Sequence, residues 1–396
     1  MVMCFEGLRY ARQRVLLLFI ACALVAFVCL QTAAAQTASP AGAGQLASGN
    51  IIAAYAYVGT NVSGNGNGNV SDYVISATGI SLSPVGHQVS GASGSLAVNQ
   101  QFVFATDGTN VVTYGRGANG DLHEVASVNG VAHNITPQDS LVGSIVLDRG
   151  GQTLYADEIN YDGADDDAYT IWTINSNGSL VYAGATDISS DYFAPLAFSQ
   201  NDLYAYGYGC YFASWDIFGF TRNTQNGALT SFNPNAAIPP GNGMYCPANL
   251  AVSATNHVAV AYSDVSQQGS NFLLADYAIN NNNGTLNLVQ NSEITTPFTA
   301  VTSTQFDPTG TYLAVAGNLG IQMYQLTSAG TLTAIGSVVD PNVAFETVRW
   351  DNSNHLYAIS SSGLYVFRST NGVLTQAPGY PLPQNQAASL AVLPAQ

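Results

Sequence analysis

The sequence predicts an all-β fold, a seven-bladed β-propeller of four-stranded blades whose ring is closed by the C-terminal strand completing blade 1. Three observations predict it. A Gly-x-Leu turn recurs seven times, a β-rich run precedes each copy, and one strand of the first repeat is found at the far end of the chain. Repeats of roughly 20 to 50 residues are typical of propellers and other repeat architectures.

The recurring turn sets the number of repeats, because its copies are spaced 41 to 58 residues apart along the chain. Short β-rich runs between Gly, Pro, Asn and Ser predict strands joined by tight turns. The copies are Gly79-Ile80-Ser81-Leu82, which is one residue longer, and Gly120-Asp121-Leu122, Gly178-Ser179-Leu180, Gly227-Ala228-Leu229, Gly284-Thr285-Leu286, Gly330-Thr331-Leu332 and Gly372-Val373-Leu374.

The strand that is out of place predicts how the ring closes. Six of the seven repeats contain an additional strand before the β-rich run, but the first repeat, which begins with Ala54 to Val58, lacks it. The missing copy is Ser389 to Val392 near the C-terminus. A ring closed in this way leaves only short edges, whereas a linear solenoid needs capping units. A β-sandwich pair or a right-handed β-helix would not explain the displacement.

Two motifs resemble a known family. Tyr57-Val58-Gly59-Thr60-Asn61 and the stretch Phe306-Asp307-Pro308-Thr309-Gly310-Thr311-Tyr312-Leu313-Ala314-Val315-Ala316 are similar to the repeat of the lactonase-type, or YVTN-type, seven-bladed propellers. That family includes 6-phosphogluconolactonases and carboxymuconate cyclases. The resemblance covers nearly all of the chain after residue 35 and implies the fold more specifically than the activity, because the repeat is part of the scaffold.

The family's functional residues are only partly matched. They include a Pro-His-x-His stretch before an inner strand and an acidic Asp-Leu-Gly-x-Asp stretch after the next strand. Alignment on Asp148 puts Leu141 and Gly143 at the histidine positions and Asp157 at the start of the acidic stretch, which is one residue longer here and lacks the glycine. The resemblance therefore carries over Asp157 alone. Loss of both imidazoles removes the acid–base groups suited to neutral pH.

The N-terminal segment predicts export. Three arginines precede an apolar run from Val15 to Leu30, and Ala33-Ala34-Ala35 forms a small-residue cleavage site, as in secretory signal peptides. We therefore expect a signal peptide over 1–35, a flexible linker over 36–50 and the propeller over 51–396. A membrane anchor is the alternative, but the apolar run is short for a span. The predicted location is secreted or periplasmic.

Charge and cysteine content narrow the partners. Cleavage after residue 35 would remove three of eight basic and one of 24 acidic residues, which leaves a net charge of −18 and no lysine. Such a surface repels nucleic acid and anionic lipid, so we expect neither as a partner, and we expect a monomer. Cys210 and Cys246 would be the two cysteines left in an oxidising compartment, which predicts one disulfide. Two unpaired buried thiols are the alternative.

The longest insertions are predicted on one face. If strands a to d of each blade run from the axis outward, the b–c and d–a connections share a face, here named the long-loop face. Blades 1, 3, 4 and 5 have long b–c segments there, at 59–71, 157–167, 207–215 and 263–271. Insertions gathered on one face of a repeat protein often mark its binding face, although neutral drift of exposed loops is the alternative.

Two of these segments have distinctive chemistry. The segment of blade 3 holds six carboxylates, of which Asp157, Glu158, Asp165 and Asp167 are candidate ligand contacts. Asp162, Asp165 and Asp167 could hold Ca²⁺, the one cofactor considered, but the spacing is not that of an EF-hand and a solvated acidic hairpin is the better-supported reading. In blade 4, Tyr211, Phe212 and Trp215 could stack on a sugar or peptide, or pack against the loop.

One inner strand carries unusual charges. Glu346 stands at the mouth end of strand a in blade 7, where the other blades have Gly94, Gly143, Ala194, Ala248, Thr302 and Ala388. A single acid in a small, neutral ring indicates the axial channel. Arg349 on the same strand is a second candidate, and the alternative is a structural ion pair between the two.

These patterns support two functions. The first is an exported propeller that binds a carbohydrate, another small molecule or a protein on its long-loop face without catalysis. The second is a lactone hydrolase at the channel mouth, with Asp157 and Glu346 as its candidate catalytic residues. A structural role in the cell envelope is a third reading, and fold does not decide among them.

Overall fold

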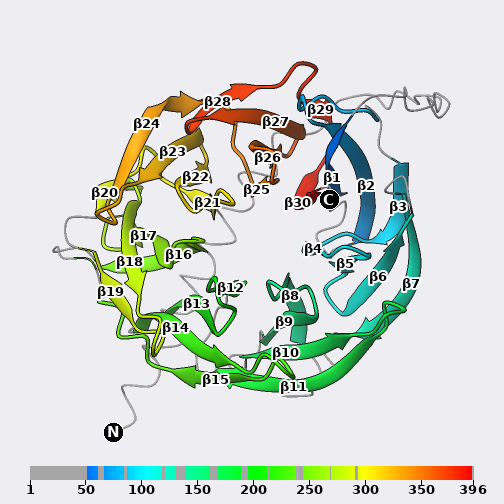
Figure 1. The fold of residues 1–396 in the computed structure, drawn as a ribbon, viewed down its shortest axis with the longest axis horizontal. Coiled ribbons are helices and arrows are strands. Elements are labelled where there is room, and N and C mark those ends of the chain that lie inside the picture. The colour runs from blue at the N-terminus through cyan, green and yellow to red at the C-terminus, as the bar shows by residue number, and fades with distance from the viewer. Residues whose placement is uncertain are drawn as a thin grey trace, which may run out of the picture. The chain divides into compact units, whose positions relative to one another are not determined.

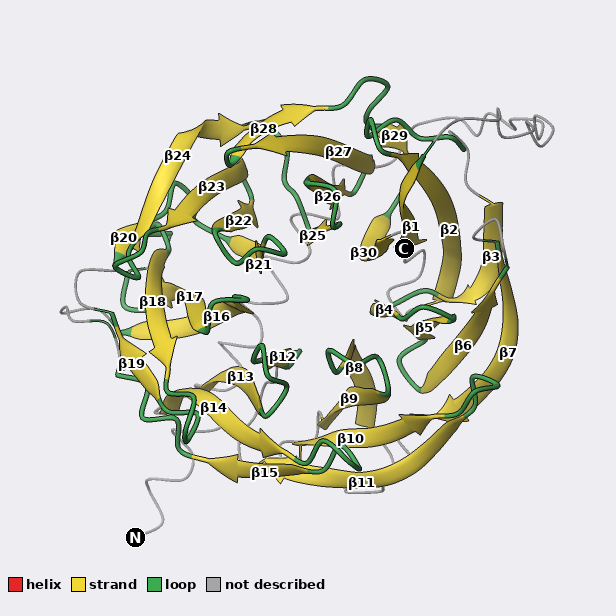
Figure 2. Ribbon diagram, in the orientation of Figure 1, coloured by secondary structure: helices red, strands yellow, loops and turns green. Residues whose placement is uncertain are grey.

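The computed structural model describes residues 51–394 apart from 61–66, 84–86, 118–120, 131–139, 161–166, 189–194, 212–213, 238, 240–243, 268 and 290–292. Within these ranges the chain forms strands and no helix. The strands make seven antiparallel sheets that follow one another around a ring, as Figure 1 and Figure 2 show. The predicted fold class is therefore confirmed.

Each sheet is one blade, with its strands in the order a, b, c and d from the axis outward. Two blades carry an additional short strand paired to strand c. The bounds are as follows: blade 1, β30 (Ala387–Pro394), β1 (Ile52–Thr60), β2 (Asn67–Ser76), β3 (His87–Ala92); blade 2, β4 (Leu96–Val98), β5 (Phe102–Thr106), β6 (Asn110–Arg116), β7 (Leu122–Asn129); blade 3, β8 (Ser140–Leu147), β9 (Thr153–Asn160), β10 (Asp167–Ile174), β11 (Leu180–Ile188); blade 4, β12 (Ala197–Phe198), β13 (Tyr204–Tyr211), β14 (Ser214–Arg222), β15 (Leu229–Phe232); blade 5, β16 (Tyr245–Val252), β17 (His257–Asp264), β18 (Leu273–Ile279), β19 (Leu286–Leu288), β20 (Ile294–Thr295); blade 6, β21 (Val301–Phe306), β22 (Tyr312–Gly317), β23 (Gly320–Leu326), β24 (Leu332–Val339); blade 7, β25 (Thr347–Trp350), β26 (His355–Ser360), β27 (Gly363–Thr370), β28 (Val373–Gln376), β29 (Leu382–Pro383).

The ring closes through the C-terminal strand. β30 pairs antiparallel with β1, with Leu390 opposite Val58 and Leu393 opposite Tyr55, and it takes the innermost place of blade 1. A strand that was expected from its displacement in the sequence thus supplies the missing partner of the first repeat. This pairing removes the open edge that β1 would otherwise present.

The short a–b turns share one capping device. The side chain of the first turn residue accepts hydrogen bonds from backbone N–H groups at the start of strand b. Asp307 accepts them from Thr311 and Tyr312, both at 2.8 Å, and Asp148 accepts them from Gln152 and Thr153. Such side-chain to backbone bonds explain why Asp, Asn and Ser recur at turns. The Asp-Pro-Thr-Gly motif is therefore scaffold.

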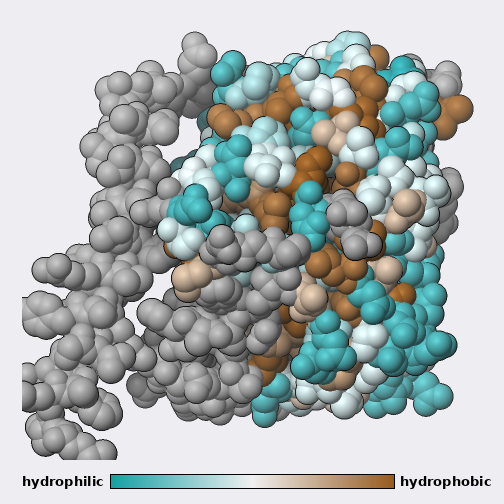
Figure 3. Space-filling model, turned by 90° about the vertical axis from the view of Figure 1, so that its left-hand side faces the viewer, coloured by the Kyte–Doolittle hydropathy of each residue, from teal (hydrophilic) through white to brown (hydrophobic). Residues whose placement is uncertain are grey.

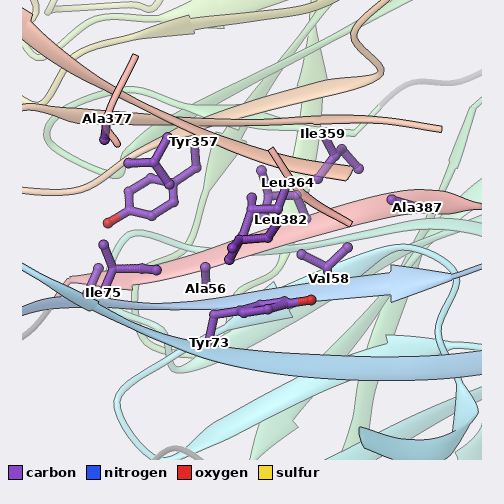
Figure 4. Packing of buried hydrophobic residues seen from close by; sticks show 13 residues of the cluster. Ala56, Val58, Tyr73, Ile75, Tyr357, Ile359, Leu364, Ala377, Leu382 and Ala387 are labelled. Atoms are coloured by element: carbon purple, nitrogen blue, oxygen red, sulfur yellow. The ribbon is translucent and has the colours of Figure 1, made fainter. Parts of the chain in front are cut away.

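The hydrophobic core lies between neighbouring blades. Figure 4 shows one such layer, in which Ala56, Val58 and Tyr73 of blade 1 face Tyr357 and Ile359 of blade 7. Tyr206 reaches across to the next blade, where its hydroxyl group donates to the carbonyl of Gly284 at 2.8 Å. Alternating side chains of each strand can pack on both faces because every sheet is covered on both sides.

Three of the four predicted long-loop segments have wrong boundaries. In blade 1, residues 59–60 belong to β1 and residues 67–71 to β2, so the predicted segment 59–71 is strand at both ends. The segment 207–215 is not a long loop, because β13 extends to Tyr211 and β14 begins at Ser214, so Tyr211 and Trp215 belong to strands. Asp157 and Glu158 likewise lie inside β9, and the connection that follows spans only 161–166. Each sheet has neighbouring blades on both sides, which stabilise extended chain there, and Gly207 leaves room for a facing side chain. A Cβ at Gly207 would stand 2.8 Å from the hydroxyl of Tyr169.

The outer wall is chemically mixed. Figure 3 shows hydrophilic and hydrophobic side chains interspersed over the part of this side that is described. Of the residues that the structure describes, none forms a helix long and apolar enough to cross a membrane.

Candidate ligand site in the central channel

The seven inner strands enclose a cavity of about 1270 Å³ at the centre of the ring. Its lining extends from residues at the long-loop face, such as Gly94 and Thr347, to residues of the a–b turns at the opposite end, such as Asp307. The inner strands surround this centre in Figure 2. Pockets of several hundred Å³ or more are large enough for a small organic ligand.

Much of the polar lining holds the blades together. Ser95 accepts a hydrogen bond from the backbone N–H of Ile145, at 3.1 Å, and Ser303 accepts one from Val348, at 3.2 Å. Asn249 does the same for Thr304 at 2.9 Å. In each case a side chain of one inner strand binds the backbone of the next blade. These groups are therefore already engaged by the scaffold.

Arg349 is different from its equivalents in the other blades. The strand registers place it level with residues that are small or neutral, namely Ala97, Val146, Ala197, Ala251, Gln305 and Ala391. The Arg349 side chain is half-buried, lines the cavity, and donates one hydrogen bond from Nη1 to the carbonyl of Val348 at 2.9 Å. It makes no ion pair with any carboxylate in the described part of the chain. Burial lowers the pKa of Arg349 to about 10.

Glu346 does not pair with Arg349. Its side chain is exposed at the long-loop end of the channel, and its backbone N–H continues the ladder by donating to Ile359 at 2.8 Å. Residues three apart on an extended strand are separated by roughly 10 Å and point to opposite sides. The structural ion pair considered from the sequence is therefore not formed, and the two charges stand at different depths.

The carboxylates of β9 are buried between blades and do not line the cavity. Asp157 is 2% exposed and accepts a hydrogen bond from Ser144 at 3.3 Å. It lies on the side of blade 4, because burial and then the Asp157 charge raise the pKa of Tyr208. Glu158 is 1% exposed and points the other way, since adjacent strand residues alternate. These two candidates therefore do not form a common site.

Several predicted residues fall outside what the structure describes. Asp162, Asp165 and Phe212 lie in 161–166 and 212–213. The backbones of Asp167, Cys210, Tyr211 and Trp215 belong to strands, but their side chains are not described. Cys246 is buried in β16. The Cys210–Cys246 disulfide and the calcium site stay predictions.

Sequence reasoning missed two groups of residues. Gln305, the neighbour of Arg349 in the same layer, is the one other long polar side chain there, and alignment of the inner strands would have found it. The second group is a buried network around Arg222, whose side chain is 3% exposed and pairs with Asp148 and Asp202. Asp148 and Arg222 are 74 residues apart, so no local pattern shows the pair.

Among the described residues, no group of three or more His, Cys, Asp or Glu side chains is placed to hold a metal ion. In the channel, the guanidinium of Arg349 shares the wall with two carboxylates, Asp107 and Asp307, which are engaged in capping their own turns. Such a pocket can bind and orient an anion by charge and by the planar donor array of the guanidinium.

Comparison with solved structures finds the same seven-bladed propeller fold in proteins that are described as lactonases. A candidate 6-phosphogluconolactonase from Bacteroides uniformis superposes with a TM-score of 0.65 at 15% identity, covering 86% of this chain and 99% of that one. The periplasmic gluconolactonase PpgL of Pseudomonas aeruginosa gives 0.65 at 14%, with 86% and 99% covered.

The likeness extends to propellers with other roles. Sqt1 of Chaetomium thermophilum, bound to the N-terminus of ribosomal protein L10, gives a TM-score of 0.51 at 13% identity, with 83% of this chain and 88% of that one covered. No protein-family model and no curated protein matches the chain. At these identities the structural matches confirm the fold predicted from the repeat motifs, and they leave the activity open.

Proposed function

We propose that this protein is an exported propeller that binds a small ligand from its long-loop face, in the central channel. The observation that carries the proposal is the cavity of about 1270 Å³, whose wall includes the small inner-strand residues Ala197, Ala251 and Ala388. Export is supported by the predicted signal peptide and by the periplasmic PpgL among proteins of the same fold.

Two variants of this function are favoured by specific observations. A protein partner on the long-loop face is favoured by Sqt1, a propeller of similar fold that was solved with a bound peptide segment. Lactone hydrolysis at the channel mouth is favoured by the candidate 6-phosphogluconolactonase and by the exposed position of Glu346. Asp157 supports hydrolysis less, because it is buried between blades 3 and 4.

The test compares ligand binding by the wild-type protein with ligand binding by variants in which a large side chain fills the channel. Isothermal titration with a panel of neutral sugars, sugar acids and aldonolactones should show a 1:1 complex with wild type. Ala197→Trp, on inner strand β12, should abolish it, and Val373→Trp on the outer strand β28 is the matched control.

Circular dichroism and the melting temperature establish that both variants fold, and Thr347→Trp at the channel mouth is a second blocking variant. Unchanged binding in folded Ala197→Trp and Thr347→Trp proteins would reject the channel as the site. Lactone hydrolysis by wild type that Glu346→Gln abolishes would favour the enzyme over the binding protein.

A further inference from the structure

We infer that the channel ligand is a small monoanionic carboxylate, such as a sugar acid, and that Arg349 recognises its carboxylate group. This inference rests on the proposed function, since it names the class of ligand that the channel takes. It is carried by the position of Arg349 in the cavity wall and by the absence of an ion-pair partner for it among the described residues.

Three of the four other arginines after residue 35 are engaged by neighbouring groups of the protein, and the fourth, Arg368, is exposed. Arg222 pairs with Asp148 and Asp202, and Arg116 lies over the ring of Tyr55, with Cζ 4.8 Å from its centroid. Arg149 also borders the cavity, but its Nε and Nη2 donate to the carbonyls of Phe198 and Ser199 at 2.8 to 3.1 Å. Arg349 therefore differs in facing the cavity with most of its donors uncommitted.

An uncompensated cation in a half-buried position is costly to the scaffold. Its desolvation is normally offset by a counter-charge, and here the chain has 24 acidic residues against eight basic ones from which to supply one. No described carboxylate has been placed beside Arg349. The presence of the Arg349 guanidinium, despite the free energy of its desolvation, is explained if a bound ligand supplies the counter-charge.

The surroundings of Arg349 fit a carboxylate better than a phosphate. A guanidinium presents parallel N–H donors that match the two oxygens of a carboxylate. The carboxylates that border the same cavity, Asp107 and Asp307, cap their own turns, with Asp107 bound to Asn110 at 2.6 Å and Asp307 to Thr311 at 2.8 Å. Among the described residues of this wall, Arg349 is the one cation whose donors are largely uncommitted, so a dianionic phosphate would bring one negative charge too many, whereas a carboxylate balances it.

The remainder of the ligand is expected to be polar and small. The layer of Arg349 contains Gln305 in the adjacent blade, and Ala197 and Ala251 of the same layer also border the cavity, which leaves width beside the guanidinium. Thr347, on the same strand as Arg349, and Gln305 both border the cavity. Their hydroxyl and amide groups can bind the hydroxyl groups of a sugar acid.

The experiment compares ligands that differ only in charge. Isothermal titration of the full protein uses D-gluconate against the neutral D-glucitol, and D-glucuronate against D-glucose, with glucitol 6-phosphate as the dianion. We expect wild type to prefer each carboxylate over its neutral partner by at least tenfold, and to bind the phosphate more weakly than gluconate. Equal affinity for charged and neutral ligands, or a preference for phosphate, would overturn the inference.

Variants assign the preference to Arg349. Arg349→Met should remove the preference for carboxylate while binding of D-glucitol persists, and Arg349→Lys should keep part of it because the charge remains without the planar donors. Arg368→Met, which removes an exposed arginine of β27, is the matched control and should leave the preference intact. If Arg349→Met does not fold, a reduced preference for carboxylate in Arg349→Lys still tests the role of Arg349.

The outcomes separate this inference from the proposed function. Wild type that binds neither neutral nor anionic sugars would reject both. Wild type that binds neutral sugars in the channel, without a carboxylate preference that depends on Arg349, would reject the anion site and retain the ligand-binding function.

Discussion

Two arginines of this protein, Arg222 between blades 3 and 4 and Arg349 in the central channel, occupy opposite electrostatic environments. The guanidinium of Arg222 contacts the carboxylate of Asp148, donates to Asp202 at 2.7 Å and to the hydroxyl of Tyr155 at 2.8 Å, and its side chain is 3% exposed. Among the described residues, the side chain of Arg349 has one hydrogen-bond acceptor, the carbonyl of Val348.

The difference shows that a buried charge which stabilises the fold is given hydrogen-bond and ion-pair partners by the fold itself. In the gap between blades every donor of Arg222 is given an acceptor, and burial raises the pKa of Asp202 against the opposing effect of Arg222. Arg116 is intermediate in the number of its partners. It contacts no carboxylate of the described residues, but it lies over the ring of Tyr55 and donates to the carbonyl of Gln100 at 2.7 Å. A charge left without such partners is better explained by an external ligand than by stability.

The largest expected effect is on the network of Arg222. Arg222→Met should lower the free energy of unfolding by about 3 to 5 kcal/mol, because it leaves the buried carboxylate of Asp148 without its cation. Denaturant titration followed by circular dichroism measures it. Arg368→Met, at an exposed site, should change stability by less than about 0.5 kcal/mol. Equal stability of the two variants would contradict the contrast drawn here.

A second prediction asks whether a buried carboxylate can do without an arginine. Asp276 is fully buried beside Nδ1 of His257, at 2.6 Å, and burial raises its pKa from 3.8 to about 6. The folded state therefore holds this proton more tightly than the unfolded chain does. The more tightly held proton of Asp276 stabilises the folded state fully below about pH 4, and this stabilisation is lost as the pH rises to about 6. The loss in the free energy of unfolding is roughly 3 kcal/mol.

Asp276→Asn should flatten the fall in stability between pH 4 and 6, and Asp187→Asn, an exposed acid on β11, should leave it unchanged. Melting temperatures recorded across this range give the answer. A wild-type protein whose stability does not change from pH 4 to 6 would show that the His257 contact compensates for burial.

The sequence was sufficient for the fold because its signals are local. A Gly-x-Leu turn at each repeat and alternating β-rich runs are read within a few residues, and the displaced strand 389–392 fixes ring closure. Arg349 could be found for the same reason, since the inner strands can be aligned on one another.

The remainder could not be read because it depends on distant contacts. Arg222 is 20 residues from Asp202 and 74 from Asp148, and they meet only when blades 3 and 4 pack. The segment 207–215 was predicted as a loop, but β13 and β14 pair there as a long hairpin, and neighbouring blades stabilise this extended chain. Whether Asp157 faced the channel also depended on strand register.

A third prediction compares two buried tyrosine hydroxyls. Tyr155 donates to the carbonyl of Gly227 at 2.8 Å and accepts from Arg222, whereas the hydroxyl of Tyr57 makes no well-formed hydrogen bond with a described residue and has the guanidinium of Arg116 nearby. Tyr155→Phe should therefore cost about 2 kcal/mol, and Tyr57→Phe should be nearly neutral. The two free energies of unfolding, measured side by side, test it. If Tyr57→Phe lowered the free energy of unfolding more than Tyr155→Phe, the hydroxyl of Tyr57 would have a hydrogen-bond partner between blades 1 and 2, outside the described residues.

The smallest effect is expected at Arg349 itself. If its charge serves a ligand, Arg349→Met should change the free energy of unfolding of the ligand-free protein by less than about 0.5 kcal/mol or raise it, because an uncompensated cation is replaced by an apolar side chain of similar length. The melting temperature in the presence of D-gluconate should then rise for wild type and stay constant for the variant. A loss of stability comparable to that of Arg222→Met, in the absence of any ligand, would place Arg349 with the scaffold and leave the channel without a dedicated anion contact.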